Sequence, residues 1–174
     1  MYEEHRHMAE SALRMLLVGA SFVGARWYGS LIAMVARPRA AENGRPYDII
    51  YGEVSLSIES RFALFADRPA MFPDRFEDIP DVPFHEQVGT IARLARDPIR
   101  DVALGERHPH LILTFASGRV FFLNGYDDKY ESWTIETTKC SGGDWTIVAV
   151  PESDVALFDP ANTVDLAEDL DDDI

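Results

Sequence analysis

The chain has 174 residues, of which 47% are hydrophobic, so it can bury the core of one substantial domain or of two small domains packed together. Thirty acidic residues against sixteen basic ones give a formal net charge of −14. This charge excludes strong binding to nucleic acid or anionic lipid and favours basic partners, although solubility alone would also account for it.

Cysteine content and hydropathy indicate a compartment for the protein. Cys140 is the single cysteine, so an internal disulfide is excluded and a reducing compartment is expected. No apolar run reaches the length of a membrane span. Glu3 and Glu4 precede the first apolar run, unlike the basic start of a signal peptide, so we expect a cytoplasmic protein with no membrane partner.

Residues 1–66 predict a helix followed by antiparallel strands. Alanine and leucine recur at helical spacing through residues 3–17. Residues 20–36 are aromatic and β-branched around a central turn, which is typical of a hairpin. Residues 53–59 alternate between apolar and polar, which predicts a half-buried strand, and residues 61–65 either continue that strand or pair back.

The next segment, residues 67–83, is expected to be an acidic connector on the surface and a boundary between two halves. It carries four prolines among acidic residues, which excludes a central strand or a long helix. Beyond it, residues 84–95 have helical apolar spacing that stops at Asp97-Pro98, and residues 99–104 predict a strand.

The best-specified stretch of the chain is a series of strands that starts at Leu111. Residues 111–115 and 120–123 are apolar runs joined by a turn at Gly118, and residues 131–136 alternate cleanly. We expect these three strands to form one antiparallel sheet. Residues 145–150 and 155–158 predict the last two strands, broken by Pro151.

These elements predict an α+β fold, mainly antiparallel sheet, as two small sheets or halves with two packed helices. Residues 1–66 and 84–160 would each supply a helix and an antiparallel sheet. An offset of 79 residues sets the strand at Ile32 against the strand at Leu111, and the strand at Leu56 against the strand at Ile135. Strand patterns align easily by chance, so both a duplication and a coincidence stay open.

Few residues suggest chemistry. His108 and His110 would share one face of a strand, but a metal site needs a third ligand, so we interpret them as two solvated histidines and expect no metal and no cofactor. Cys140 lacks a neighbouring base, so it is not expected to be a nucleophile, and no catalytic residue is predicted. Asp127, Asp128 and Glu131 gather at a hairpin mouth without the spacing of a calcium loop.

The C-terminal tail, residues 161–174, is dense in acids. It contains Asp169, Asp171, Asp172 and Asp173, whose like charges repel one another. Such a tail is usually a solvated, frayed end, and the functional alternative is an acidic finger that fills a basic cleft.

A family resemblance adds to this interpretation. From residue 99 to residue 158 the sequence reads IRDVALG, then LILTFASGRV, then YESWTIE, then a short glycine-bearing loop and a last strand. This segment resembles small bacterial domains encoded beside secreted toxin genes, several families of which are assigned as immunity proteins of polymorphic toxin systems, especially in actinobacteria. The resemblance implies a cytoplasmic, acidic protein without enzymatic activity that occludes the active site of a nuclease or of an NAD- or nucleotide-hydrolysing toxin.

We therefore expect a non-enzymatic toxin inhibitor with an acidic binding surface. The partner-binding residues predicted first are Asp127, Asp128, Tyr130 and Glu131, and the acids of the tail come second. The partner would be a cognate toxin with a basic surface, and not a nucleic acid. The alternatives are an adaptor subunit that contacts another basic protein, and a small-molecule-binding domain or enzyme. The sequence does not specify an oligomeric state.

Overall fold

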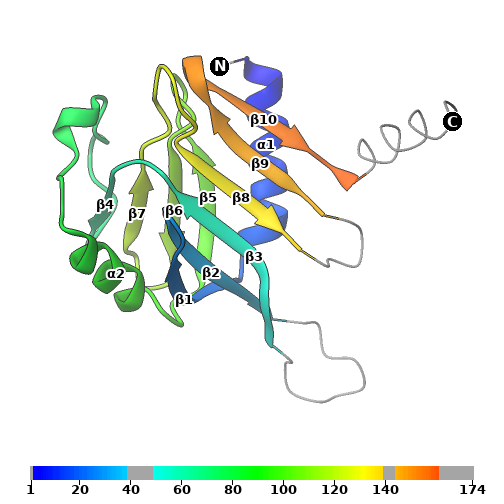
Figure 1. Cartoon of the computed structure of the whole chain (residues 1–174), viewed down its shortest axis with the longest axis vertical. Coiled ribbons are helices and arrows are strands. Elements are labelled where there is room, and N and C mark those ends of the chain that lie inside the picture. The colour runs from blue at the N-terminus through cyan, green and yellow to red at the C-terminus, as the bar shows by residue number, and fades with distance from the viewer. Residues whose placement is uncertain (1, 39–48, 139–143, 161–174) are drawn as a thin grey trace, which may run out of the picture.

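Two antiparallel sheets and two α-helices make up the described part of the protein, as the computed structural model shows in Figure 1. The structure describes residues 2–38, 49–138 and 144–160. The α+β class predicted from the sequence is confirmed. Neither helix in the described part of the chain combines the length and the apolar character needed to cross a lipid bilayer.

Ten strands and two α-helices follow one another along the described chain, with two short 3-10 turns between them. The helices are α1 (Glu3–Leu17) and α2 (Phe84–Arg93), and the short turns are η2 (Phe76–Asp78) and η3 (Pro151–Ser153). The strands are β1 (Ser21–Trp27), β2 (Leu31–Pro38), β3 (Ile49–Ile58), β4 (Phe62–Phe65), β5 (Ile99–Leu104), β6 (Leu111–Phe115), β7 (Val120–Leu123), β8 (Trp133–Thr137), β9 (Thr146–Val150) and β10 (Asp154–Phe158). The predicted elements are therefore present, with ends that shift by a few residues.

The strand order differs from the one we expected. The larger sheet has the order β1-β2-β3-β8-β9-β10, and the smaller has the order β4-β7-β6-β5. The prediction that β6, β7 and β8 form one sheet is wrong, because β8 pairs with β3 and β9 in the larger sheet. Sequence periodicity identifies which residues of a strand face the core, but it does not identify the neighbouring strand.

The two halves of the chain exchange strands. The meander β1-β2-β3 is extended by β8 from the second half, and the meander β5-β6-β7 is extended by β4 from the first half. The offset of 79 residues thus aligns α1 with α2, β1 with β5 and β2 with β6. It then sets β3 against β8, which are neighbours in one sheet, with Leu56 opposite Ile135. By strand order, β7 is the counterpart of β3.

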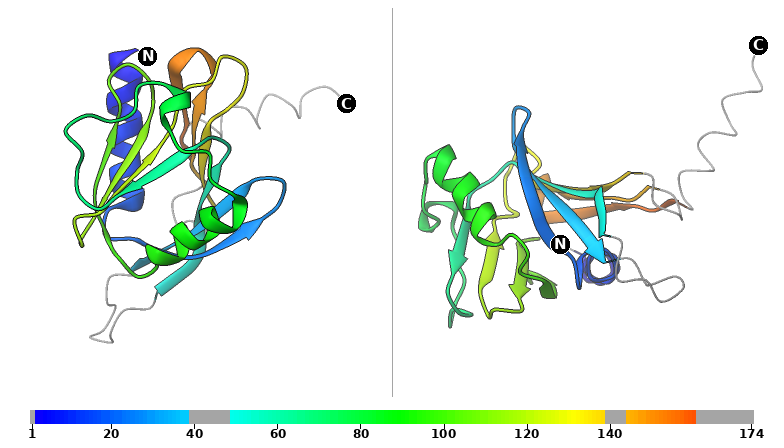
Figure 2. Two further views of the ribbon diagram at one scale, coloured as in Figure 1. Left: turned by 90° about the vertical axis from the view of Figure 1, so that its left-hand side faces the viewer. Right: turned by 90° about the horizontal axis from the view of Figure 1, so that it is seen from below.

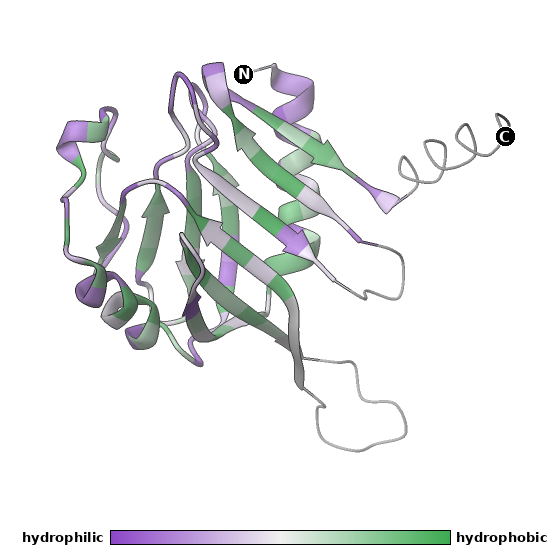
Figure 3. Cartoon of the chain, in the orientation of Figure 1, coloured by the Kyte–Doolittle hydropathy of each residue, from purple (hydrophilic) through white to green (hydrophobic). Residues whose placement is uncertain are grey.

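One continuous hydrophobic core joins both sheets and α1. Helix α1 lies against β5 and β10 (Figure 2), and its apolar stripe is buried in that contact. Trp133, Phe22, Phe115 and Phe121 are the largest of the fully buried side chains in this core. Colouring by hydropathy shows the same pattern, because apolar residues run along the strands of both sheets (Figure 3). Each Å² of apolar surface removed from water stabilises the fold by about 25 cal/mol, so the burial that the two sheets share holds them together.

The connector at residues 67–83 does more than link two halves. Ile79 is 1% exposed, and the ring of Phe72 stacks on that of Phe122, with centroids 5.4 Å apart and planes 12° apart. These contacts cover the face of the four-stranded sheet that points away from the main core. For this reason every residue of β7 is buried. The acidic, proline-rich composition suggested only a surface segment and gave no sign of this second apolar layer.

Candidate functional site

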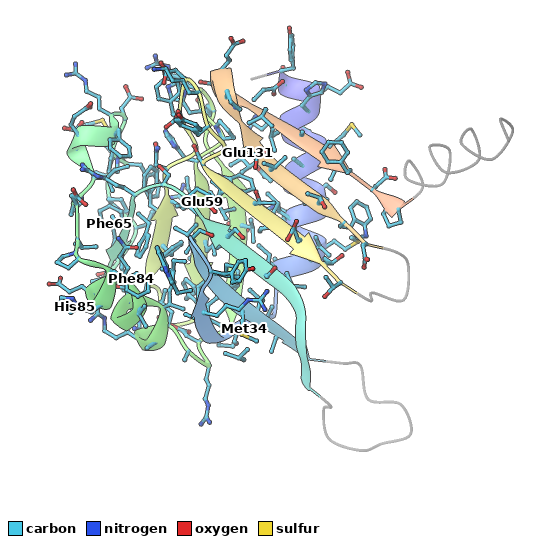
Figure 4. All side chains as sticks on the ribbon, in the orientation of Figure 1. Met34, Glu59, Phe65, Phe84, His85 and Glu131 are labelled. Carbon is cyan, nitrogen blue, oxygen red and sulfur yellow. The ribbon has the colours of Figure 1, made fainter. Side chains whose placement is uncertain are left out.

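An open hollow of about 610 Å³ lies where β3 ends and β8 begins. Its walls come from the bend after β3, from the loop before β8 and from the turn between β9 and β10. The lining residues are Glu59, Ser60, Asp127, Lys129, Tyr130, Glu131 and Pro151, and we call this feature the acidic hollow. Glu59 and Glu131 mark it in Figure 4, and both carboxylates are exposed.

The loop that carries most of the hollow is held in place by Asn124. This side chain is 1% exposed, and its amide donates hydrogen bonds to the Ser60 hydroxyl and to the Tyr126 carbonyl, both at 2.8 Å. The Asn124 backbone N–H also donates to the Arg61 carbonyl at 3.0 Å. The two walls of the acidic hollow are therefore fixed to each other by buried hydrogen bonds.

Asp127 shapes the rim of the hollow. Its Oδ1 accepts hydrogen bonds from the backbone N–H groups of Lys129 at 2.8 Å and Tyr130 at 3.0 Å. This Asx-type turn presents the side chains of Lys129, Tyr130 and Glu131 to solvent. Tyr130 is 72% exposed, so its ring is accessible at the rim of the hollow.

The structure brings together three of the four residues predicted first. Asp127, Tyr130 and Glu131 all line the hollow, whereas Asp128 is exposed beside it and is not part of its lining. The acids of the tail (Asp169, Asp171, Asp172 and Asp173) and Cys140 lie outside the described residues.

Sequence reasoning missed the opposite wall of the hollow, formed by Glu59, Ser60 and Pro151. Glu59 ends the alternating run 53–59, and only the pairing of β3 with β8 brings it close to Glu131. The signal that could have found Glu59 was the polar end of a predicted strand, but nothing in the sequence showed what it would face.

Behind the hollow lies a histidine corner in which His110 is buried and His108 is half-buried, so the interpretation that both are solvated is wrong. His110 is 8% exposed, and its Nδ1 accepts a hydrogen bond from the Gly125 N–H at 3.0 Å. Its ring packs on that of Phe122, with centroids 5.0 Å apart. The Trp133 indole donates to the Pro109 carbonyl at 2.8 Å, which fixes the same corner from the core side.

Burial controls the protonation of both rings in this corner. Desolvation lowers the pKa of His110 to about 4, and the neighbouring His108 adds a smaller effect in the same direction. Desolvation, followed by the charge of Arg107, also lowers the pKa of His108. Within residues 2–38, 49–138 and 144–160, no group of three or more histidine, cysteine, aspartate or glutamate side chains is arranged to hold a metal ion.

A strained turn connects the histidine corner to the hollow. Glu152 and Ser153, between β9 and β10, have φ angles of 65° and 67°. The backbone N–H of Glu152 donates to the Asp127 carbonyl at 3.3 Å, and the Ser153 hydroxyl lies 2.7 Å from His108 Nδ1. Left-handed backbone at two successive non-glycine residues costs about 1 kcal/mol or more at each. The surrounding contacts therefore hold this wall of the hollow in one conformation.

Electrostatics define what the hollow can bind. Its lining has three carboxylates (Glu59, Asp127 and Glu131) against one ammonium group (Lys129), and the whole chain is strongly acidic. A concave, negatively charged surface concentrates cations and steers basic partners toward it. The arrangement is a concave acidic surface with one exposed aromatic side chain at its rim.

Comparison with known proteins assigns the chain to no family. No protein-family model matches the chain. No curated protein matches it, and no solved structure does so either. The function must therefore be argued from the geometry of the acidic hollow.

Proposed function

We propose that this protein is a non-enzymatic immunity protein that binds a basic toxin through the acidic hollow. The observation that carries the proposal is the pair of exposed carboxylates, Glu59 and Glu131, beside the exposed ring of Tyr130 on a rigid frame. Charge complementarity raises the association rate, and a buried aromatic anchor slows dissociation.

The charge of the whole chain supports the same partner chemistry. Six of the acidic residues lie in residues 161–174, and without them the net charge changes from −14 to −8. The chain therefore attracts a basic protein even without its tail. A toxin that acts on nucleic acid or on a nucleotide has a basic cleft for its substrate, and an acidic protein can occupy that cleft in the cytoplasm of the producing cell.

Affinity capture with matched charge variants tests this proposal. The bait would be the full chain as wild type, as the hollow variant Glu59→Lys/Glu131→Lys, or as the control Glu136→Lys/Asp144→Lys. Both control residues are exposed and lie toward the far end of β8 and β9, and the change in net charge is the same in both variants. Mass spectrometry would identify the retained proteins.

We expect wild type and control to retain the same basic protein and the hollow variant to lose it. Expression of that protein alone should stop growth, and co-expression with wild type should restore it. Equal retention by all three baits would refute the role of the hollow. A retained protein without toxicity would refute the immunity function and indicate an adaptor.

A further inference from the structure

A second surface lies at β4, which is an edge strand of the smaller sheet. A groove of about 390 Å³ runs along its free edge, and all four residues of β4 line the groove. The other wall is formed by α2 and by residues 73–82 of the connector. In Figure 4, Phe65 labels β4, and Phe84 and His85 label the start of α2.

The backbone of β4 offers hydrogen-bonding groups to this groove. The Asn124 N–H donates to the Arg61 carbonyl, so these residues form a hydrogen-bonded pair of the antiparallel ladder with β7. Because such pairs alternate along a ladder, Ala63 and Phe65 also bond to β7. The N–H and C=O groups of Phe62 and Leu64 therefore point to the free edge. No backbone hydrogen bond joins them to another described segment.

The helix wall of the groove is fixed. Glu86, Thr90 and Arg93 occur at helical spacing on one face of α2, and all three line the groove. Thr90 is 7% exposed, its hydroxyl donates to the Glu86 carbonyl at 3.0 Å, and it accepts from the Arg93 guanidinium at 2.8 Å. A fixed helix opposite a free strand edge leaves a preformed slot between them.

Charge indicates which segment would fit. The carboxylates of Asp78 and Glu86 line the groove together with one cation, Arg93. Within the described residues, Asp78 has no ion pair, and the Glu86 carboxylate has an ion pair only with His85, at 4.0 Å. A basic side chain in the groove would give these two carboxylates a partner.

We propose that this groove binds an extended, basic segment of a partner protein, which adds to β4 as a further strand. Main-chain hydrogen bonds to Phe62 and Leu64 would provide the register, and the carboxylates of Asp78 and Glu86 would select lysine or arginine. This surface is distinct from the acidic hollow, and the inference does not depend on the immunity function.

Two variants at Leu64 separate strand addition from side-chain contact. Leu64→Ala and Leu64→Pro both remove the leucine side chain. Only proline also removes the outward N–H and places its ring where a partner strand would bind. Leu64 donates no hydrogen bond to β7, so proline removes no hydrogen bond of the ladder at this position. The probe would be a phage-displayed library of random dodecapeptides, panned on the full wild-type chain, followed by synthesis of the enriched peptides.

We expect enriched peptides to alternate apolar residues and to contain lysine or arginine. Leu64→Ala should retain affinity for the peptide within about threefold. Leu64→Pro should raise Kd by at least about tenfold, which corresponds to about 1.4 kcal/mol of binding free energy. In the wild-type chain, the bound peptide should slow hydrogen exchange of the Phe62 and Leu64 amides, and this measurement remains decisive even where the proline variant fails to fold.

Three results would overturn the inference. The first is a library without enrichment, and the second is slowed exchange that maps to the acidic hollow instead of β4. The third is concentration-dependent protection of the Phe62 and Leu64 amides without peptide, which would identify a second copy of this chain as the occupant.

Discussion

Gly125 is the position where one added methyl group should do the most damage to the acidic hollow. A Cβ at this residue would lie 2.0 Å from the Pro109 oxygen and 2.3 Å from the Pro109 carbonyl carbon, where ordinary contact begins at 3.4 Å. Both obstacles are backbone atoms and cannot rotate away. Relief requires the loop before β8 to separate from the histidine corner, which lengthens the bonds Gly125–His110 and Trp133–Pro109.

The expected cost of Gly125→Ala follows from these contacts. Overpacking of a dense site costs about 1–3 kcal/mol, and weakening two buried hydrogen bonds adds about 2 kcal/mol, so we expect about 4 kcal/mol in the free energy of unfolding. At about 2–4 °C per kcal/mol for a domain of this size, Tm should fall by about 8–16 °C.

Thermal unfolding followed by circular dichroism would measure this change, with Gly89→Ala as the control. A Cβ at Gly89 would lie 4.0 Å from the Arg93 guanidinium, and alanine is a better helix former than glycine by about 1 kcal/mol, so Tm should rise by a few degrees. A Gly125→Ala protein as stable as wild type would refute the close approach of the loop to the histidine corner.

Three further predictions concern protonation and packing. Because burial holds the pKa of His110 at about 4 against 6.5 in the unfolded chain, the folded state loses stability as pH falls below 6.5. Urea unfolding at pH 7 and pH 5 should show a loss of about 2 kcal/mol in wild type and a much smaller loss in His110→Gln, in which only the half-buried His108 keeps a lowered pKa, and equal losses would contradict this. Ile79→Ala should lower the free energy of unfolding by about 3 kcal/mol in the same assay. The control Met71→Ala lies in the same connector, but Met71 is 84% exposed, so its effect should stay within about 0.5 kcal/mol. Equal effects of the two substitutions would refute the second apolar layer. Trp133→Phe should lower the free energy of unfolding by about 3 kcal/mol, because it leaves a cavity and an unpaired Pro109 carbonyl. A variant as stable as wild type would show that the indole hydrogen bond does not stabilise this corner.

Local patterns carried most of the information about the elements. The spacing of Leu13, Leu16 and Leu17 identifies the buried face of α1, and the alternation from Trp133 to Thr137 identifies that of β8. Such periods arise from the geometry of one helix or strand, so they can be found in the sequence. The pairing of β8 with β3 depends on contacts between residues about 80 positions apart, and periodicity contains no information about such a partner.

In the candidate site, too, features local in the sequence could be predicted and contacts between distant residues could not. Asp127, Tyr130 and Glu131 are close together in the sequence, and the structure places them in one hollow. Glu59 joins them only through the exchange of strands between halves. His110 looked solvated because histidine is polar, but it is buried: the Gly125 N–H donates to its Nδ1, and its Nε2 has no hydrogen-bond partner within the described residues. That hydrogen bond depends on a glycine fifteen residues away, and nothing local to the histidine indicates it.

Association kinetics with the captured partner test the central claim most directly. Rates would be measured for wild type, for Glu59→Lys/Glu131→Lys and for Glu136→Lys/Asp144→Lys at low and at physiological salt. We predict that the hollow variant associates at least about tenfold more slowly at low salt and loses most of its salt dependence, whereas the control stays close to wild type. Equal rates for the two charge-matched variants would contradict the account, because they would show that net charge alone guides the partner.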